Sequence, residues 1–157
     1  MSTSPTARLR AVHPDIERAL GEGLDEAMIR RVVDRFYALA RHDGVIGPIF
    51  LRVVPDERWQ AHLDTIGDFW SSMLLGTGRY DGRPMPKHMA IPELDDVHFQ
   101  RWLALFRQTV EELCPPAAAA LFIDRSERVA NSFRINIKMR RGEEIVHLKP
   151  LEREELT

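Results

Sequence analysis

The sequence predicts an all-α protein with a single core. Apolar residues recur at helical spacing in four long stretches, and glycine and proline clusters separate these stretches. The chain has 157 residues, 44% of them hydrophobic, which is enough to bury a core and to line a pocket. We therefore expect four long helices, one short helical turn and an N-terminal extension, with no long linker.

The first two long helices are expected on either side of residues 42–55. The first runs from Asp25, a suitable N-cap, to about Arg41, with Gly44 beyond its end. Its apolar face carries Met28, Ile29, Val32, Val33, Phe36, Tyr37 and Ala40. The second follows Pro55, with Asp56 as its expected cap, and ends at Leu75. Its inner face carries Trp59, His62, Leu63, Ile66, Phe69, Trp70 and Met73.

A break follows the second helix. Glycines and prolines crowd the segment from Gly76 to Pro86, which predicts an irregular loop. Residues Pro86 to Ala90 are expected to form one helical turn, because proline is favoured at the first helical position. Pro92 then stops this turn.

Two further long helices are expected in the second half of the chain. One begins near Asp96, and the pair Pro115–Pro116 ends it and starts the last helix, which stops at Gly142. Residues 133–139 also alternate between apolar and polar side chains, as a strand would. We expect helix there, because the preceding alanine-rich stretch favours it.

The chain is expected to divide into three parts. Residues 1–20 form an N-terminal extension with a short helix around Pro14–Leu20, and residues 21–142 form the helical domain. Residues 143–157 are a highly charged tail, expected either to be mobile or to lie extended on the surface.

Charge and composition argue against several classes of partner. The net charge of −2 gives no field for binding nucleic acid or an anionic membrane. No run of about 18 apolar residues is present, and the N-terminus lacks a signal-peptide pattern. Cys114 is the sole cysteine, expected to be a buried structural thiol, so no internal disulfide can form. We expect a cytoplasmic protein with no nucleic-acid or membrane partner.

Six histidines are available, but the sequence contains neither an HExxH nor a CxxC metal motif. His88 lies among apolar residues after the glycine- and proline-rich loop, so it is either a partly buried histidine bonded to a carbonyl or a metal ligand. His62, Tyr37 and Trp102, taken singly, are each more typical of core packing. Taken together, the four side chains suit a flat apolar cofactor with a metal at its centre.

The segment from about Gly23 to Gly142 resembles the group III truncated haemoglobins of bacteria. The resemblance rests on motifs that occur in order and at the family's spacing: Phe36-Tyr37, Gly47-Pro48-Ile49-Phe50, His62, Ile66-Gly67-Asp68-Phe69-Trp70, residues 73–80, residues 82–88 and residues 99–106. It implies a shortened globin fold, in which two helix pairs enclose haem b (iron protoporphyrin IX) and the proximal helix is reduced to a turn.

The resemblance also implies roles for individual residues. His88 matches the proximal ligand of the haem iron, while Tyr37, Trp102 and His62 match the distal residues that face a bound ligand. The side chains expected to pack against haem are Phe36, Phe50, Ile66, Phe69, Trp70, Met85, Ile91, Phe106 and Phe133. Candidates for binding the haem propionates are Arg79, Tyr80, Arg83 and Lys87, although a solvated loop explains these four equally well.

Two functions remain open on this basis. The first is redox chemistry on O2, NO or peroxide, as a haem peroxidase or NO dioxygenase; with no GxGxxG motif in the chain, a separate reductase would be needed. The second is simple binding, transport, storage or sensing of O2, NO, CO, cyanide or sulfide. A helical interaction module with Tyr37, Trp102 and His88 in its core is the non-haem alternative. His62 is expected to act as a gate to the pocket, or else to bind the iron itself when no other ligand is present.

Overall fold

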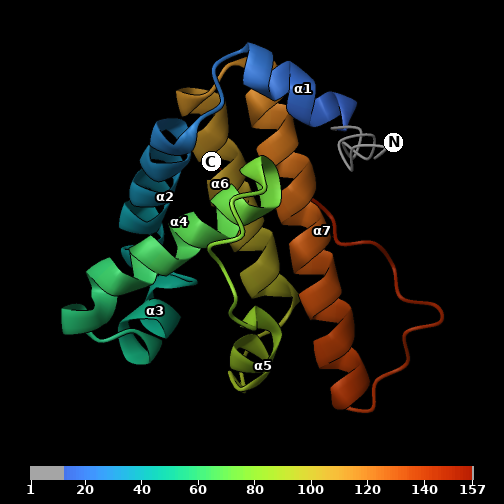
Figure 1. The fold of residues 1–157 in the computed structure, drawn as a ribbon. Helices are drawn as coiled ribbons and strands as arrows, with labels where there is room; N and C mark the ends of the chain where they lie inside the picture. Colours follow the sequence, from blue (N-terminus) through green and yellow to red (C-terminus); the bar gives the residue numbers. More distant parts are fainter. Residues whose placement is uncertain (1–12, 157) are drawn as a thin grey trace, which may run out of the picture.

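A computed structural model describes residues 13–156, and Figure 1 shows their arrangement. This part of the chain is helical throughout, apart from connections and the tail, and contains no strand. Its elements are α1 (Pro14–Gly21), α2 (Glu26–Arg41), α3 (Gly47–Val53), the 3-10 helix η2 (Asp56–Arg58), α4 (Trp59–Leu75), α5 (Pro84–Met89), α6 (Asp96–Leu113) and α7 (Pro116–Arg140). The all-α expectation is confirmed.

The long helices pack as two pairs. Helices α6 and α7 lie side by side, α4 crosses in front of them, and α2 contacts both α4 and α6 (Figure 1). Helix α1, the short helix expected at Pro14–Leu20, packs against the start of α7 and buries Ala19 there. Residues 1–12 of the expected extension lie outside the described part.

Helix α2 forms as its sequence predicts. The Asp25 carboxylate accepts a hydrogen bond from the Met28 amide at 2.8 Å, which satisfies one of the free amides of the first turn. The seven apolar residues of the expected stripe are all buried: Met28, Ile29, Val32, Val33, Phe36, Tyr37 and Ala40. This stripe brings Tyr37 to the inside of the molecule.

Helix α3 was not expected, and the start of α4 differs from its prediction. The segment Gly47–Val53 forms a helix with a proline in its first turn. Asp56 does not cap α4, because residues Asp56–Arg58 form a 3-10 turn whose N-cap is Pro55, and the Asp56 carboxylate instead pairs with Arg41. The expected end of α4 is confirmed: Gly76 follows Leu75 in the left-handed conformation, with φ of 68°.

Helix α5 begins two residues earlier than expected, at Pro84 rather than Pro86. Both prolines lie in its first turn, where amides have no intrahelical acceptor, so neither proline costs a hydrogen bond. The helix ends at Met89, before the expected stop at Pro92. The whole element is six residues long and places His88 in its last turn.

Helices α6 and α7 begin and end close to the expected positions. Asp95 and His98 form a reciprocal cap at the start of α6, and Pro115–Pro116 separates the two helices. Residues 133–139 are helical, so the alternating pattern there does not form a strand. Phe133 and Ile137, one turn apart, are buried, while Met139 is exposed.

The tail after α7 lies extended on the surface. Residues 143–148 arch away from α7, and the chain then returns toward α6 and α7 (Figure 1). Within residues 13–156, no helix is long and apolar enough to cross a membrane.

Candidate functional site

Two separate apolar clusters form the interior. We call the first the large cluster; it joins α1, α2, α4, α6 and the first part of α7, and its half-buried members include Phe50, Trp59, Ile66, Phe69 and Trp102. We call the second the small cluster; it joins α5, the start of α6 and α7 around Leu94, Phe99, Ala130, Phe133 and Ile137. His62 belongs to α4, on the large-cluster side, and His88 belongs to α5, on the small-cluster side.

His88 is held by the backbone of its own helix and by one aromatic ring. Its Nδ1 lies 2.7 Å from the Pro84 carbonyl oxygen, so Nδ1 is the nitrogen that carries the proton and donates. Its ring centroid lies 4.5 Å from that of Phe133. This arrangement leaves Nε2 as the nitrogen with a free lone pair, which is the arrangement of most metal-bound histidines.

The environment of His88 favours the neutral imidazole that a metal requires. Burial lowers the pKa of His88, the hydrogen bond to Pro84 opposes this shift, and the charge of Lys87 adds to it. His88 is therefore neutral at pH 7, and no proton has to leave before Nε2 binds a metal.

His62 carries a buried nitrogen without a partner. Its Nε2 is buried and has no hydrogen-bond partner among the residues that the structure describes, a costly arrangement for a polar atom. Burial lowers the pKa of His62, and the charge of Lys87, together with that of His88 whenever His88 is protonated, lowers it further. The ring of Tyr37 packs edge-on against His62, with 5.8 Å between the centroids.

Tyr37 and Trp102 form a buried polar pair. Trp102 lies beside Tyr37, where hydrogen bonding from its indole lowers the pKa of the phenol, and only 6% of Tyr37 is exposed. Burial raises the pKa of Tyr37, and the hydrogen bond from Trp102 offsets only part of that shift, so the phenol keeps its proton. Because its oxygen accepts from the indole, the phenol O–H is free to donate to a ligand.

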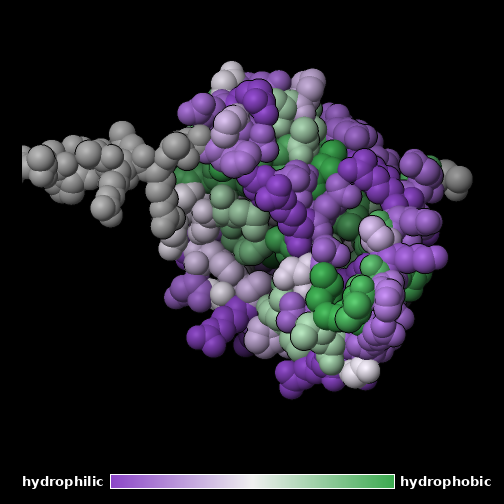
Figure 2. All heavy atoms as spheres, turned by 90° about the vertical axis from the view of Figure 1, so that its right-hand side faces the viewer, coloured by the Kyte–Doolittle hydropathy of each residue, from purple (hydrophilic) through white to green (hydrophobic). Residues whose placement is uncertain are grey.

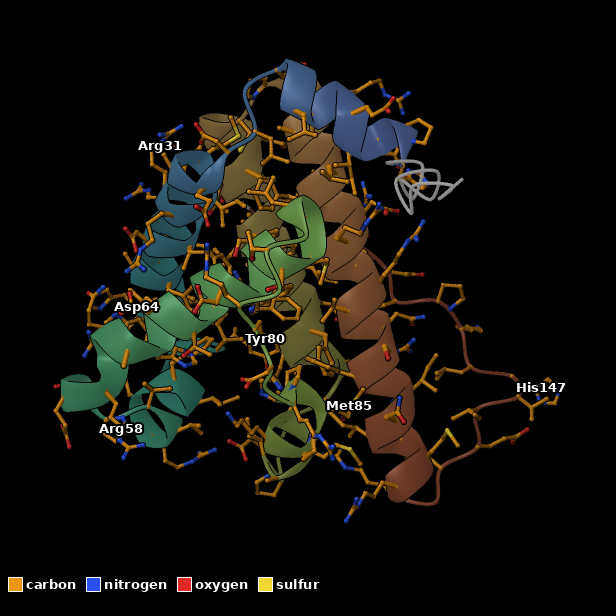
Figure 3. The ribbon with its side chains drawn as sticks, viewed as in Figure 1. Arg31, Arg58, Asp64, Tyr80, Met85 and His147 are labelled. Carbon is orange, nitrogen blue, oxygen red and sulfur yellow. The ribbon has the colours of Figure 1, made fainter. Side chains whose placement is uncertain are left out.

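The nine predicted haem-packing residues divide between the two clusters. Phe36, Phe50, Ile66, Phe69, Trp70 and Phe106 belong to the large cluster, and Met85, Ile91 and Phe133 belong to the small cluster. Figure 3 shows Met85 on α5, next to α7. Phe36, Trp70 and Phe106 are at most 2% exposed, so they pack behind the half-buried residues that a cofactor would contact.

The four propionate candidates lie in different surroundings. Arg79 pairs with Glu26 and Asp68, and Tyr80 packs on Phe69 with 5.3 Å between the ring centroids. Figure 3 shows Tyr80 beneath α4. Arg83 and Lys87 are exposed at the start and on the last turn of α5. Because Lys87 also acts on both histidines, it is the candidate best placed beside them.

Sequence reasoning did not assign Trp59 to the site. Its ring lies 5.9 Å from His62 and 6.4 Å from Tyr37, measured between centroids, and the Arg41 guanidinium carbon lies 4.6 Å above it. The signal in the sequence is its position three residues before His62, which places both on one helix face. Trp59 therefore packs on one side of the His62 ring.

These residues fit a haem group. A flat apolar macrocycle needs two facing apolar walls, and half-buried members of the two clusters supply them. Its iron needs one neutral imidazole, which His88 offers through Nε2. His62, with its unpaired Nε2, and Tyr37, with its phenol O–H, lie on the large-cluster side and are the groups that would hydrogen-bond to a ligand of the iron.

Comparison with known proteins points to the same cofactor. No protein-family model matches the chain. A protein of Campylobacter jejuni named group 3 truncated hemoglobin ctb is 32% identical over 114 residues, which span 71% of this chain and 90% of that protein. The crystal structure of group III truncated hemoglobin from Campylobacter jejuni superposes with a TM-score of 0.70 at 31% identity, over 74% of this chain and 93% of the other. With this identity, coverage and fold, the chain belongs to the group III truncated haemoglobins, which are haem globins.

Proposed function

We propose that this chain holds haem b through Nε2 of His88 and binds O2 and other diatomic ligands on the side of Tyr37, Trp102 and His62, for redox chemistry on O2, NO or peroxide. The observation that carries the proposal is the 2.7 Å contact between His88 Nδ1 and the Pro84 carbonyl, because it leaves Nε2 as the ligand atom. When bound, the haem iron supplies one open coordination position for a small ligand.

The distal residues determine how that ligand is held. Donors beside a diatomic ligand that carries negative charge would form charge-assisted hydrogen bonds to it. Tyr37 can donate its phenol proton, and Trp102 polarises that proton by donating to the same oxygen. His62 adds a third polar group, whose Nε2 gains a partner when a ligand is present.

Tight holding of the ligand favours redox chemistry over delivery. One hydrogen bond to a charged acceptor contributes about 1.5–3 kcal/mol, and each 1.4 kcal/mol is roughly a tenfold change in equilibrium. Two such donors, Tyr37 and His62, would slow ligand escape by roughly two to four orders of magnitude. The same donors stabilise charge that develops when the ligand reacts, and the electrons come from a separate reductase.

The decisive experiment is a spectrum of the purified protein. We expect a Soret band that is lost in His88→Gly and restored when imidazole is added to that variant, since free imidazole then replaces the missing side chain. His42→Ala is the matched control, because His42 is exposed at the end of α2 and should leave the band unchanged. A protein that takes up no haemin, or a His88→Gly variant with an unaltered spectrum, contradicts the proposal.

The same preparation distinguishes the two roles of His62. A five-coordinate ferrous spectrum supports His62 as a polar group beside the ligand, whereas a six-coordinate low-spin spectrum lost in His62→Ala assigns it to the iron. Steady consumption of NO or peroxide with an added reductase supports turnover. Reversible binding without consumption supports the simple binding function.

A further inference from the structure

The C-terminal tail is attached to the helices at the end of its path, not along its arch. The side chains of three helical residues donate to its backbone carbonyls: Arg134 to Lys149 at 3.0 Å, Gln100 to Glu152 at 3.1 Å and Arg107 to Glu154 at 2.8 Å. The arch itself stands clear of α7, with His147 at its tip pointing outward (Figure 3). A hollow of about 370 Å³ lies between the arch and α7, lined partly by Ile135, Ile145 and Leu148.

The face over which the tail runs is shown in Figure 2, where apolar side chains are interspersed with hydrophilic ones. Val146, on the arch, is 81% exposed. Leu151, by contrast, packs against the small cluster. The attachment therefore begins where the tail meets the cluster that holds His88.

Arg134 connects this attachment to the site. It is only 5% exposed, and its guanidinium binds both oxygens of Asp96 at 2.7 and 3.0 Å while it donates to the tail. A bidentate pair of this kind fixes direction as well as distance, so α7, the start of α6 and the tail meet at one buried cation. The residue before Arg134 is Phe133, whose ring lies 4.5 Å from His88.

A second attachment reaches the opposite side of the site. Arg101 Nη2 lies 3.1 Å from the Glu154 carboxylate in the tail, and Arg101 Nη1 lies 3.9 Å from Asp43. The Asp43 carboxylate accepts from the Val45 and Ile46 amides and so shapes the turn that leads into α3. Arg101 immediately precedes Trp102, so the end of the tail also restrains the helix turn that carries the indole.

We propose that residues 149–156 form a strap that positions the iron-binding histidine, with Leu151 and Arg134 transmitting the restraint through Phe133 to His88. The proposal rests on the proposed function, since it assigns the strap to the wall behind the iron ligand. Leu151 and Arg134 are positioning residues, because neither touches His88 itself.

The test compares the full chain with a chain that ends at Leu148. The shortened chain keeps the arch and loses every attachment described above. His147→Ala is the matched control, since His147 is at the exposed tip of the arch. Should the shortened chain fail to fold, Leu151→Ala replaces it, because that variant keeps the backbone attachments and removes one apolar contact with the small cluster.

Three measurements are made on each protein. We expect haemin to transfer to excess apomyoglobin about tenfold faster from the shortened chain, the effect of losing one hydrogen bond to a charged group. The iron–histidine stretching band in the resonance Raman spectrum of the ferrous protein should shift or broaden. In the apoprotein, the Ala90 and Ile91 amides, which donate to the carbonyls of Pro86 and His88, should exchange faster.

Unchanged transfer rate, Raman band and amide exchange in a folded shortened chain would overturn the strap. An effect of equal size in His147→Ala would also overturn it, because that variant leaves the attachments intact. The apoprotein exchange measurement decides the strap even if the full chain binds no haemin, an outcome that would contradict only the proposed function.

Discussion

Tyr37 and Trp102 show how a buried hydroxyl can be satisfied and still keep a proton to donate. The indole nitrogen of Trp102 carries one hydrogen and cannot accept, so in a hydrogen bond with the phenol it can only be the donor. With the indole as its donor, the phenol keeps its own hydrogen available for another acceptor. At the scale of single residues, this pair gives the site its polarity.

Replacing Tyr37 by phenylalanine should raise the O2 dissociation rate at least about tenfold, because one hydrogen bond to a charged ligand is lost. Trp102→Phe should raise the rate less, since it removes the group that polarises the phenol and leaves the phenol proton in place. Stopped-flow displacement of O2 by CO measures both rates. If neither substitution alters the rate, these two residues are not the distal donors.

The same scale shows the limit of sequence reasoning about single residues. The spacing of His88 favoured a carbonyl-bonded histidine over a metal ligand, and the structure shows that these two roles are not mutually exclusive. Nδ1 makes the carbonyl contact while Nε2 remains available. Only the ordered family motifs pointed to the second role, because no local pattern reports which nitrogen is free.

At the scale of elements, long helices could be predicted and short ones could not. The stripe of α2 and the proline break before α7 extend over enough residues to show a period. Helix α3 has seven residues, which is two turns and too few for a repeat to be visible. The prediction for Asp56 was wrong because a carboxylate suits both a helix cap and an ion pair. In the structure, Asp56 forms an ion pair with Arg41.

Gly47 joins α3 to the end of α2, and its replacement by alanine should be destabilising. A Cβ at this position would lie 2.7 Å from the Arg41 carbonyl oxygen, which is backbone and cannot rotate away. We expect a loss of about 1–3 kcal/mol in the free energy of unfolding, as for other overpacked sites. Urea denaturation of the apoprotein measures it.

Gly44→Ala is the control for this substitution. Gly44 lies in the same connection, and a Cβ there would meet no atom within 4 Å. Its effect should stay within about 0.5 kcal/mol, as for most surface substitutions. Equal losses in both variants would show that the connection, rather than the close approach to Arg41, sets the stability.

At the scale of the whole molecule, the two apolar clusters and the tail determine the site together. Apolar composition could predict a core but not its division into a large and a small cluster, because that division depends on how α5 turns back onto α7. The tail was expected to be mobile or extended, and its attachment could not be read from its charges alone. Arg153 and Glu154 pair through their charges, but the other three attachments use the tail's own backbone carbonyls, which every residue carries and no sequence pattern reveals.

The stability of the apoprotein should fall as the pH drops below about 6.5, the ordinary pKa of histidine. His62 and His88 both have a lowered pKa in the folded chain, mainly because they are buried. Below that pH, the unfolded chain binds protons that the folded chain does not, so the free energy of unfolding decreases. Urea denaturation between pH 7.5 and about 5 measures this slope.

Replacing both histidines by glutamine should flatten that slope, while His42→Ala, on the exposed end of α2, should not. An identical slope in the double variant would assign the acid sensitivity to other groups. If His88 Nε2 binds the haem iron as proposed, the same protons compete with the iron for it, so acid should release the cofactor.

The contact between His88 and the Pro84 carbonyl has a consequence for how the protein can change over time. If a carboxylate side chain were the acceptor for the imidazole, one mutation could remove that acceptor. The acceptor here is a main-chain carbonyl, which remains whatever side chain its residue carries. Residue 84 can therefore vary without removing the acceptor, as long as the helical turn persists. The orientation of His88, the proposed iron ligand, is thus protected against mutation of its hydrogen-bond acceptor.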